Sequence, residues 1–470
     1  MTGVSSVMFN KINESDIERL RDICGARDVT LDMSEDYSHD EMGSVSHMPD
    51  VLVKVYSTDV VSAVMKMANE RMIPVTVRGS GTGLVGASVA VSGGIMLETT
   101  GMNQVLELDK DNLTVTVQPG VLLMDLAAFA EEQGFLYPPD PGEKTATVGG
   151  NISTNAGGMR AIKYGVTRDY VRGLTVVLPD GRILKLGGKV VKNSSGYNLK
   201  DLIVGSEGTL AVITEAILKL VPLPVVSISM LVPFSDMESA LEAVTEIIRT
   251  KAAPTAVEYI PKEALHFAED YLGKHFPDTR FPAYLLLTFD GSSRQRVEDE
   301  FSHVADLCLE LGAQDAYFVD TDERKDAVWK TRGAFLEAFK ASTDQMDECD
   351  VVVPRSRIAE FIRYTRYVSG ESGLRIAYFG HAGDGNFHLY LCRDNYSDDV
   401  WQEKKNKCFD MLFTKAKELE GFPSGEHGIG YVMKQHLLDA VGEDQINLMA
   451  GIKKVFDPNG ILNPGKIFDY

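Results

Sequence analysis

Three histidines and a glutamate lie in two short glycine-rich stretches near the C-terminus. The sequence GHAGDGNFH contains His381 and His388, and the sequence SGEHG contains Glu426 and His427. Imidazoles and carboxylates are costly to bury unless they are paired or bound to a metal. We therefore predict a metal site formed by His381, His388 and Glu426, with His427 as a base. The alternative is two surface histidines and an unrelated Glu-His pair, because H-x6-H is not a standard metal-binding spacing.

A β-hairpin is the element that would position the first two histidines. Asp384-Gly385 is a typical turn dipeptide, and apolar runs lie on both sides of it, at 375–379 and 387–391. Glu426 and His427 follow an amphipathic helix predicted at 401–420 and lie in a second glycine turn.

Length and composition indicate a globular protein of two or three domains. The chain has 470 residues, of which 44% are hydrophobic and 24% are charged. A formal net charge of −21 argues against nucleic acid or an anionic membrane as a partner. The five cysteines are scattered without a CxxC pair, so we expect no disulfide framework and no iron–sulfur cluster. We expect no targeting peptide and no transmembrane segment, and hence a cytoplasmic protein.

Strands and helices alternate in a pattern typical of the α+β class. The first half predicts a helix that starts at Thr58 or Asp59, a second helix at 122–133, and strands at 51–55, 74–78, 94–98, 113–118, 174–178 and 210–216. The second half predicts strands at 226–232, 283–289 and 350–353 and helices at 237–250, 295–311, 325–339 and 401–420. The prolines of Val221–Pro224 indicate a domain boundary, because proline stops helices and central strands.

Residues 81–86 match the G-x-G-x-x-G pattern of dinucleotide-binding folds. That fold requires a helix after the glycines, but the next predicted strand begins only eight residues after Gly86. A Rossmann domain and an NAD-dependent dehydrogenase are therefore disfavoured. The glycine loop still offers backbone N–H groups that could bind an anion.

Two further glycine-rich segments occur in the same predicted domain, at 145–158 and 205–210. Three such loops, each next to an apolar strand, indicate a large polyphosphorylated ligand that lies along the domain. FAD fits this description better than a mononucleotide.

Eight motifs together resemble the FAD-linked oxidases of the vanillyl-alcohol oxidase/p-cresol methylhydroxylase superfamily. They are PVTVRGSGTGLVGASV, ATVGGNISTNAGG, YGVTRDYV, LPDGRIL, GYNLKDLIVGSEGTLAVITEA, FGHAGDGNFH, GEHGIG and FDPNGILNPGKIF. The branch that the chain resembles most contains the glycolate oxidase catalytic subunit, D-lactate dehydrogenase and D-2-hydroxyglutarate dehydrogenase. The resemblance implies a two-subdomain FAD-binding domain and a cap domain with an antiparallel sheet and flanking helices. We expect an N-terminal helical segment at 1–45, the FAD-binding domain at 46–222, the cap at 223–420, and a C-terminal segment at 421–470 that returns to the FAD site.

The resemblance also implies which residues contact FAD. The loop that wraps the pyrophosphate in the relatives corresponds to Arg78, Gly79, Ser80, Gly81, Thr82, Gly83 and Gly86. The loop that lines the ring and ribityl chain corresponds to Pro141, Gly142, Thr145, Thr147, Gly149, Gly150, Asn151, Thr154, Asn155 and Gly158. Further contacts are expected from Glu207, Gly208, Ile213 and Lys466, although a C-terminal lysine commonly lies on the surface. No histidine occurs between Thr76 and Ser88, so we expect non-covalent FAD.

The same resemblance assigns the catalytic groups. His381, His388 and Glu426 correspond to the ligands of a divalent metal, and His427 corresponds to the catalytic base. Arg332 matches the substrate-binding arginine, which would hold a carboxylate, and Asn386 could add a hydrogen bond. Without the resemblance, Arg332 reads as a solvated helix residue. Two imidazoles and a carboxylate suit Zn, Mn or Fe equally.

Enzymes of this branch that act on 2-hydroxyglutarate carry a basic residue where this chain has the acidic stretch Asp347-Glu348-Cys349-Asp350. We therefore expect a small monocarboxylic 2-hydroxy acid, with D-lactate ahead of glycolate. The electrons require an external acceptor, for which we favour a soluble protein such as an electron-transferring flavoprotein. Glycolate oxidase catalytic subunit, D-2-hydroxyglutarate dehydrogenase and a non-catalytic flavin redox subunit remain as alternatives.

Overall fold

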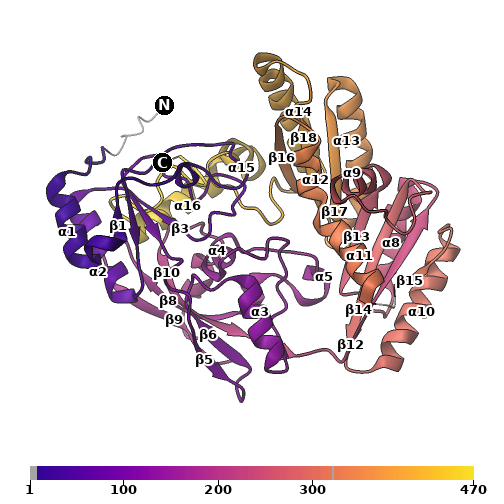
Figure 1. Ribbon diagram of the computed structural model, residues 1–470, viewed down its shortest axis with the longest axis horizontal. Coiled ribbons are helices and arrows are strands. Elements are labelled where there is room, and N and C mark those ends of the chain that lie inside the picture. Colours follow the sequence, from indigo (N-terminus) through magenta and orange to yellow (C-terminus); the bar gives the residue numbers. More distant parts are fainter. Residues whose placement is uncertain (1–7, 320–321, 470) are drawn as a thin grey trace. The chain divides into compact units, whose positions relative to one another are not determined.

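The computed structural model describes residues 8–319 and 322–469, which form two compact units. The first unit comprises residues 8–156, 166–223 and 426–469 of this described part. The second unit comprises residues 157–165 and 224–425. Consequently the C-terminal helices belong with the N-terminal strands, as the yellow and indigo ribbons of Figure 1 show.

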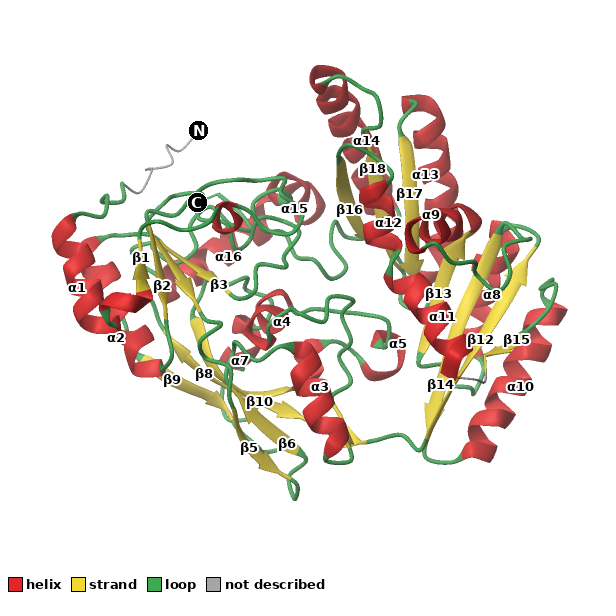
Figure 2. Ribbon diagram, in the orientation of Figure 1, coloured by secondary structure: helices red, strands yellow, loops and turns green. Residues whose placement is uncertain are grey.

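Among the described residues, the first unit contains a four-stranded sheet, a five-stranded sheet and a two-stranded pair (Figure 2). The four-stranded sheet has the order β1-β2-β4-β3, with β2, β4 and β3 parallel: β1 (Val29–Thr30), β2 (Val51–Lys54), β3 (Val75–Arg78) and β4 (Ile95–Glu98). The five-stranded sheet is antiparallel: β5 (Val105–Asp109), β6 (Thr114–Val117), β10 (Val212–Lys219), β8 (Val171–Val177) and β9 (Ile183–Gly187). A short pair joins β7 (Phe135–Leu136) and β11 (Val221–Pro222).

The helices of the first unit pack around these sheets. They are α1 (Glu14–Cys24), α2 (Thr58–Arg71), α3 (Leu123–Glu132), α4 (Val148–Thr154), α6 (Thr167–Tyr170), α7 (Leu199–Ile203), α15 (Lys434–Val441) and α16 (Glu443–Phe456), with 3-10 turns at Ala26–Asp28 and Glu35–Ser38. In α2 the side chain of Ser57 caps the first turn, and Val61, Val64 and Ala68 are buried at helical spacing. No helix occurs within residues 79–94, which join the parallel neighbours β3 and β4. The expected absence of a Rossmann crossover helix is therefore confirmed.

The second unit is built on a seven-stranded antiparallel sheet. Its order is β15 (Tyr317–Val319), β12 (Val226–Phe234), β14 (Ala283–Gly291), β13 (Ala256–Pro261), β17 (Arg375–His381), β18 (Asn386–Cys392) and β16 (Met346–Val352). Helices α9 (Lys262–Leu272), α11 (Asp322–Gly333) and α12 (Phe335–Ala341) pack on one face. The remaining helices are α5 (Ala161–Tyr164), α8 (Met237–Arg249), α10 (Arg294–Glu310), α13 (Ile358–Ser372) and α14 (Asp398–Glu418), with a 3-10 turn at Arg355–Arg357. The expected α+β class with an antiparallel cap sheet is confirmed.

Two predicted elements differ from the structure. The single helix expected at 325–339 is two helices, α11 and α12, because the helix is interrupted at Ala334, directly after the weak helix former Gly333. The strand expected at 350–353 is β16, which begins at Met346. The acidic stretch 347–350 therefore lies within a strand of the sheet rather than before it. None of the helices within residues 8–319 and 322–469 is long and apolar enough to cross a membrane.

Candidate functional site

The hairpin of β17 and β18 positions His381 and His388. His381 pairs with Asn386 and Phe379 pairs with His388, so the alternation of side chains places both histidines on the same face of the sheet. Their rings meet edge to face with centroids 5.3 Å apart. Both side chains are buried, with 5% and 4% of their surfaces exposed. The structure thus brings the two predicted metal-ligating histidines together.

Glu258 in the neighbouring strand β13 contacts one of these histidines. Its Oε1 lies 2.7 Å from Nδ1 of His381, and its Oε2 lies 2.6 Å from Nη2 of Arg332 in α11. The Glu258 side chain is completely buried. Burial raises the pKa of this carboxyl, but the charges of His381 and Arg332 outweigh burial and hold the pKa below its usual value. Arg332 is buried as well and lies over the ring of Phe379 at 4.3 Å, so it is not a solvated helix residue.

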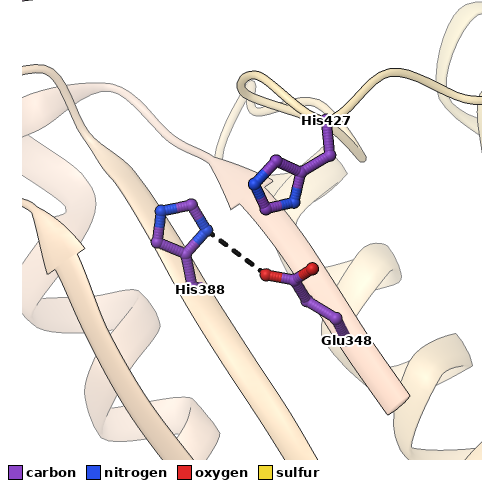
Figure 3. A group of neighbouring side chains, drawn as sticks. All are labelled: Glu348, His388 and His427. Atoms are coloured by element: carbon purple, nitrogen blue, oxygen red, sulfur yellow. Dashed lines mark ion pairs between the residues drawn. The ribbon is translucent and has the colours of Figure 1, made fainter. Parts of the chain in front are cut away.

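Two further carboxylates face His388 from strand β16. Figure 3 shows the carboxylate of Glu348 pointing toward the His388 ring, with Oε1 3.4 Å from Nδ1. Asp350 pairs directly with His388 across the strands, and its Oδ1 lies 3.7 Å from the same nitrogen. Asp347 forms an ion pair with Lys405 at 2.9 Å. The negative charge beside the histidine therefore comes from Glu348 and Asp350.

Asp350 also fixes the segment that leads to Glu426 and His427. Its Oδ2 accepts hydrogen bonds from the Ser424 hydroxyl at 2.9 Å and from the Gly425 backbone N–H at 3.0 Å. Gly425 is the last residue of the second unit, and Glu426 and His427 follow it directly. Nε2 of His427 lies 3.6 Å from Oε1 of Glu426.

Asn386 points toward the same aspartate. Its side-chain amide donates hydrogen bonds to Oδ1 of Asp350 at 2.6 Å and to the Val351 carbonyl at 3.1 Å. The amide hydrogens are thus used inside the protein, which leaves Asn386 as a support for Asp350.

The three predicted glycine loops of the first unit lie close together. A Cβ on Gly79 would approach Oγ1 of Thr147 to 2.2 Å, so the first loop contacts the second only because residue 79 is glycine. The backbone N–H of Glu207 donates to the Ser153 carbonyl at 2.7 Å, which joins the third loop to the second. Asn463 donates to the carbonyls of Ala87 and Glu207 and so joins the first loop to the third.

The Glu207 side chain holds the backbone that follows His427. Its carboxylate accepts hydrogen bonds from the N–H groups of Ile429 at 2.8 Å and Gly430 at 2.7 Å. Burial raises the pKa of the Glu207 carboxyl to about 7, although these two bonds and the nearby Lys466 favour its charged form. Burial likewise lowers the pKa of Lys466 to about 7, and its ammonium donates to the Val89 carbonyl at 2.6 Å. Lys466 is therefore not a surface lysine.

The N-terminal segment closes over the first loop. The guanidinium of Arg78 donates to the carbonyls of Asp36 and His39, both at 2.9 Å. Asp40 accepts a hydrogen bond from the Gly86 N–H at 2.6 Å. No sequence motif identified Asp40, because its role in holding the first loop depends on this contact with a residue 46 positions away.

The remaining predicted FAD residues follow the same loops. Ser80, Gly81, Thr82 and Gly83 follow β3, Pro141, Gly142 and Thr145 precede α4, and Gly149, Gly150, Asn151, Thr154 and Asn155 lie within or at the end of α4. Gly208 follows Glu207, and Ile213 is buried in β10. Gly158 belongs to the short segment 157–165 of the second unit.

Two buried hydroxyls in the loops indicate that a ligand completes this region. Within the described residues, the hydroxyl oxygens of Ser88 and Ser206 are buried and have no hydrogen-bond partner. Ser88 follows the first loop, two residues after Gly86, and Ser206 lies in the third. Buried hydroxyls are normally satisfied, so a polar ligand that runs along the loops fits both groups.

The fold and the loops together define a flavin-dependent oxidoreductase with a separate cap. Residues 49–187 match the model of the FAD binding domain, and residues 223–467 match the model of the C-terminal domain of FAD linked oxidases. The chain belongs to the family of FAD-linked oxidases.

The chain is similar over more than nine tenths of its length to named members of this family. It is 48% identical to a D-lactate dehydrogenase of Anaerostipes hadrus, over 99% of both chains. It is 39% identical to the glycolate oxidase subunit GlcD of Bacillus subtilis, over 92% of both chains. It is 32% identical to a D-2-hydroxyglutarate dehydrogenase of Stutzerimonas stutzeri, over 92% of this chain and 94% of that protein.

The fold also matches solved structures with much lower sequence identity. A crystal structure of p-cresol methylhydroxylase has a TM-score of 0.79 at 17% identity and covers 99% of both chains. A structure of alkyldihydroxyacetonephosphate synthase has a TM-score of 0.75 at 19% identity and covers 97% of this chain and 85% of that one. These matches confirm the expected fold of the vanillyl-alcohol oxidase type.

Proposed function

We propose that this protein oxidises a small 2-hydroxy acid, with D-lactate as the preferred substrate and pyruvate as the product. The observation that carries the proposal is a buried cluster of charged and imidazole side chains in the second unit. In this cluster Glu258 contacts Arg332 and His381, and Glu348 contacts His388. A 2-hydroxy acid presents a carboxylate for the arginine and a hydroxyl that must lose its proton. The similarity to a D-lactate dehydrogenase over 99% of both chains supports this substrate.

The donor groups suit a divalent metal held by His381, His388 and Glu426. A metal-ligating histidine typically presents its other ring nitrogen to a carboxylate. Glu258 lies 2.7 Å from Nδ1 of His381 and gives this histidine such support, and Glu348 forms a longer ion pair of 3.4 Å with Nδ1 of His388. Zn, Mn and Fe all accept two imidazoles and a carboxylate.

The residues of the chain divide the chemical work. When bound, non-covalent FAD would accept the substrate's α-hydrogen as hydride, and the divalent ion would act as a Lewis acid toward the hydroxyl. Arg332 binds the substrate carboxylate, and His427 accepts the hydroxyl proton, because an imidazole exchanges protons near neutral pH. Asn386 supports Asp350 and thereby the segment that carries Glu426 and His427. Glu348 disfavours a second carboxylate on the substrate.

The electrons leave to an external acceptor, for which we propose a soluble protein such as an electron-transferring flavoprotein in the cytoplasm. The scattered cysteines provide no ligands for an iron–sulfur cluster in this chain. Glycolate oxidation as a catalytic subunit is the second candidate, because the chain is 39% identical to such a subunit.

Anaerobic addition of D-lactate to the purified yellow protein tests the proposal. We expect the absorbance of the oxidised flavin to bleach rapidly with D-lactate and weakly or not at all with L-lactate or D-2-hydroxyglutarate. Bleaching by glycolate alone would favour the second candidate. A flavin that none of the 2-hydroxy acids bleaches, in protein loaded with Mn²⁺ or Zn²⁺, would support a non-catalytic redox subunit instead.

A further inference from the structure

Glu258 is a charged residue in the middle of an otherwise apolar strand. It lies between Val257 and Tyr259 in β13, and none of its surface is exposed. An ionised carboxylate in such surroundings is costly unless charged partners surround it. A glutamate at this position therefore indicates a specific role that offsets the free-energy cost of burying its charge.

The two oxygens of Glu258 have different partners. Oε1 lies 2.7 Å from Nδ1 of His381, which comes from β17. Oε2 accepts from Nε of Arg332 at 2.8 Å and lies 2.6 Å from its Nη2, and this arginine comes from α11. One carboxylate thus fixes a strand residue on one side and a helix residue on the other.

We propose that Glu258 is a positioning residue that orients the metal ligand His381 and the substrate-binding Arg332 at the same time. The inference rests on the proposed function of these two residues. A carboxylate on Nδ1 fixes the histidine tautomer with hydrogen on Nδ1, which directs the lone pair of Nε2 toward an ion.

The same contact determines which edge of the arginine meets the substrate. A guanidinium has five N–H donors. Glu258 occupies the edge formed by Nε and Nη2. The edge formed by Nη1 and Nη2 is the one that suits a second carboxylate in bidentate geometry. Glu258 would consequently align the metal, through His381, with the substrate carboxylate, through Arg332. A 2-hydroxy acid needs this alignment because its hydroxyl and carboxylate are adjacent.

The test compares Glu258→Gln with the unmodified protein, each purified with FAD and stripped of metal. Titration with Mn²⁺ by calorimetry should show a dissociation constant weakened by about 10- to 100-fold, the usual effect of removing such a partner. After saturation with Mn²⁺, the KM for D-lactate should still be raised, because Arg332 has lost its anchor. The FAD content should be unchanged, since Glu258 contacts His381 and Arg332 of the second unit and, among the described residues, none of those expected to contact FAD.

Asp278→Asn provides a matched control. Asp278 is a buried carboxylate of the same unit that also binds an arginine, Arg280, at 3.0 Å, but no histidine is among its partners in the described residues. This variant should keep the Mn²⁺ affinity and the KM of the unmodified protein. Equal changes in both variants would show that general loosening of the unit is responsible and would overturn the positioning role.

The outcomes separate this inference from the proposed function. If the unmodified protein neither binds Mn²⁺ nor is reduced by D-lactate, the proposed function fails. If it does both and Glu258→Gln retains its Mn²⁺ affinity and KM, the positioning role is overturned. A measurement on the unmodified protein covers the case in which the variant does not fold. In the metal-free form labelled with ¹⁵N-histidine, the His381 signal, assigned by its loss in His381→Gln, should show hydrogen on Nδ1, and hydrogen on Nε2 would overturn the inference.

Discussion

The carboxylate of Glu207 accepts a hydrogen bond from the backbone of Gly430 at 2.7 Å, between residues that are 223 positions apart. Ile429 donates to the same carboxylate at 2.8 Å. Gly428, directly after His427, adopts a φ of +86°, and a Cβ at this position would lie 2.9 Å from the Glu207 carboxylate. The buried side chain of Glu207 therefore fixes the conformation of the backbone that follows the proposed base, His427.

We expect Glu207→Gln to lower turnover more than it lowers FAD content. The amide offers one acceptor oxygen for two backbone donors, and leaving a buried donor unsatisfied costs about 1–3 kcal/mol. The loop of His427 would lose its fixed position, so kcat should fall about tenfold or more. Stopped-flow flavin reduction measures this effect. Glu215→Gln is the control, since within the described residues the side chain of Glu215, in the same unit, bonds only the Thr175 hydroxyl. A normal reduction rate in Glu207→Gln would contradict the role of Glu207.

The raised pKa of Glu207 predicts a dependence of stability on pH. Its pKa is raised from 4.5 to about 7 by burial, so between these values the folded protein binds more protons than the unfolded chain. The contribution of this group to the free energy of unfolding is therefore largest below pH 4.5 and is lost as the pH rises to about 7. Urea unfolding of the first unit at several pH values should show this slope, and Glu207→Gln should lack it. An identical slope in the variant would assign the dependence to other groups.

Removing a proposed metal ligand should abolish activity without removing the flavin. We expect His381→Ala and Glu426→Ala to lose bound metal and at least about 100-fold in kcat, because a Lewis acid contributes several kcal/mol to such reactions. Elemental analysis, the flavin spectrum and the rate of D-lactate oxidation check the three parts. His303→Ala, at an exposed histidine of α10, is the control. Full activity in rigorously metal-free protein would refute the metal's role.

Glu348 should control discrimination between monocarboxylic and dicarboxylic substrates. Glu348 is buried, and its Oε1 lies 3.4 Å from Nδ1 of His388. If the second carboxylate of a dicarboxylic substrate lay about 8 Å from Glu348, the repulsion between the two charges would cost about 2 kcal/mol at an effective dielectric constant near 20. In Glu348→Gln we expect the ratio of kcat/KM for D-2-hydroxyglutarate to that for D-lactate to rise about tenfold or more. Steady-state kinetics with both acids measures the ratio. Asp347→Asn is the neighbouring control, because Asp347 pairs with Lys405, and an equal rise there would argue against a specific role of Glu348.

The sequence predicted the parts of the site that depend on local pattern. The turn Asp384-Gly385 between apolar runs predicted the hairpin, and its register follows from the alternation of side chains, so His381 and His388 could be placed on one face. The three glycine loops were also readable, because glycine marks positions where no side chain fits, as at Gly79.

Glu258 was not predicted, because its meaning depends on distant partners. It is one charged residue in the run AVEYIP, and its partners Arg332 and His381 lie 74 and 123 positions further along the chain. A glutamate inside an apolar strand is a signal that a buried charge needs partners, but the sequence does not identify them. The strand β16 shows a related limit, because Asp347 and Glu348 are poor strand formers and the pairing with β18 overrides their preference.

The path of the chain between the two units has a consequence for synthesis in the cell. The first unit includes residues 426–469, which are synthesised after the second unit, and Asn463 from this segment joins two of its three glycine loops. A nascent chain therefore contains the complete second unit while its first unit still lacks the C-terminal segment that joins two of the glycine loops. The hydrogen bonds of Asn463 to the two loops can therefore form only after the second unit has been synthesised, and a chain that stops before residue 426 lacks them.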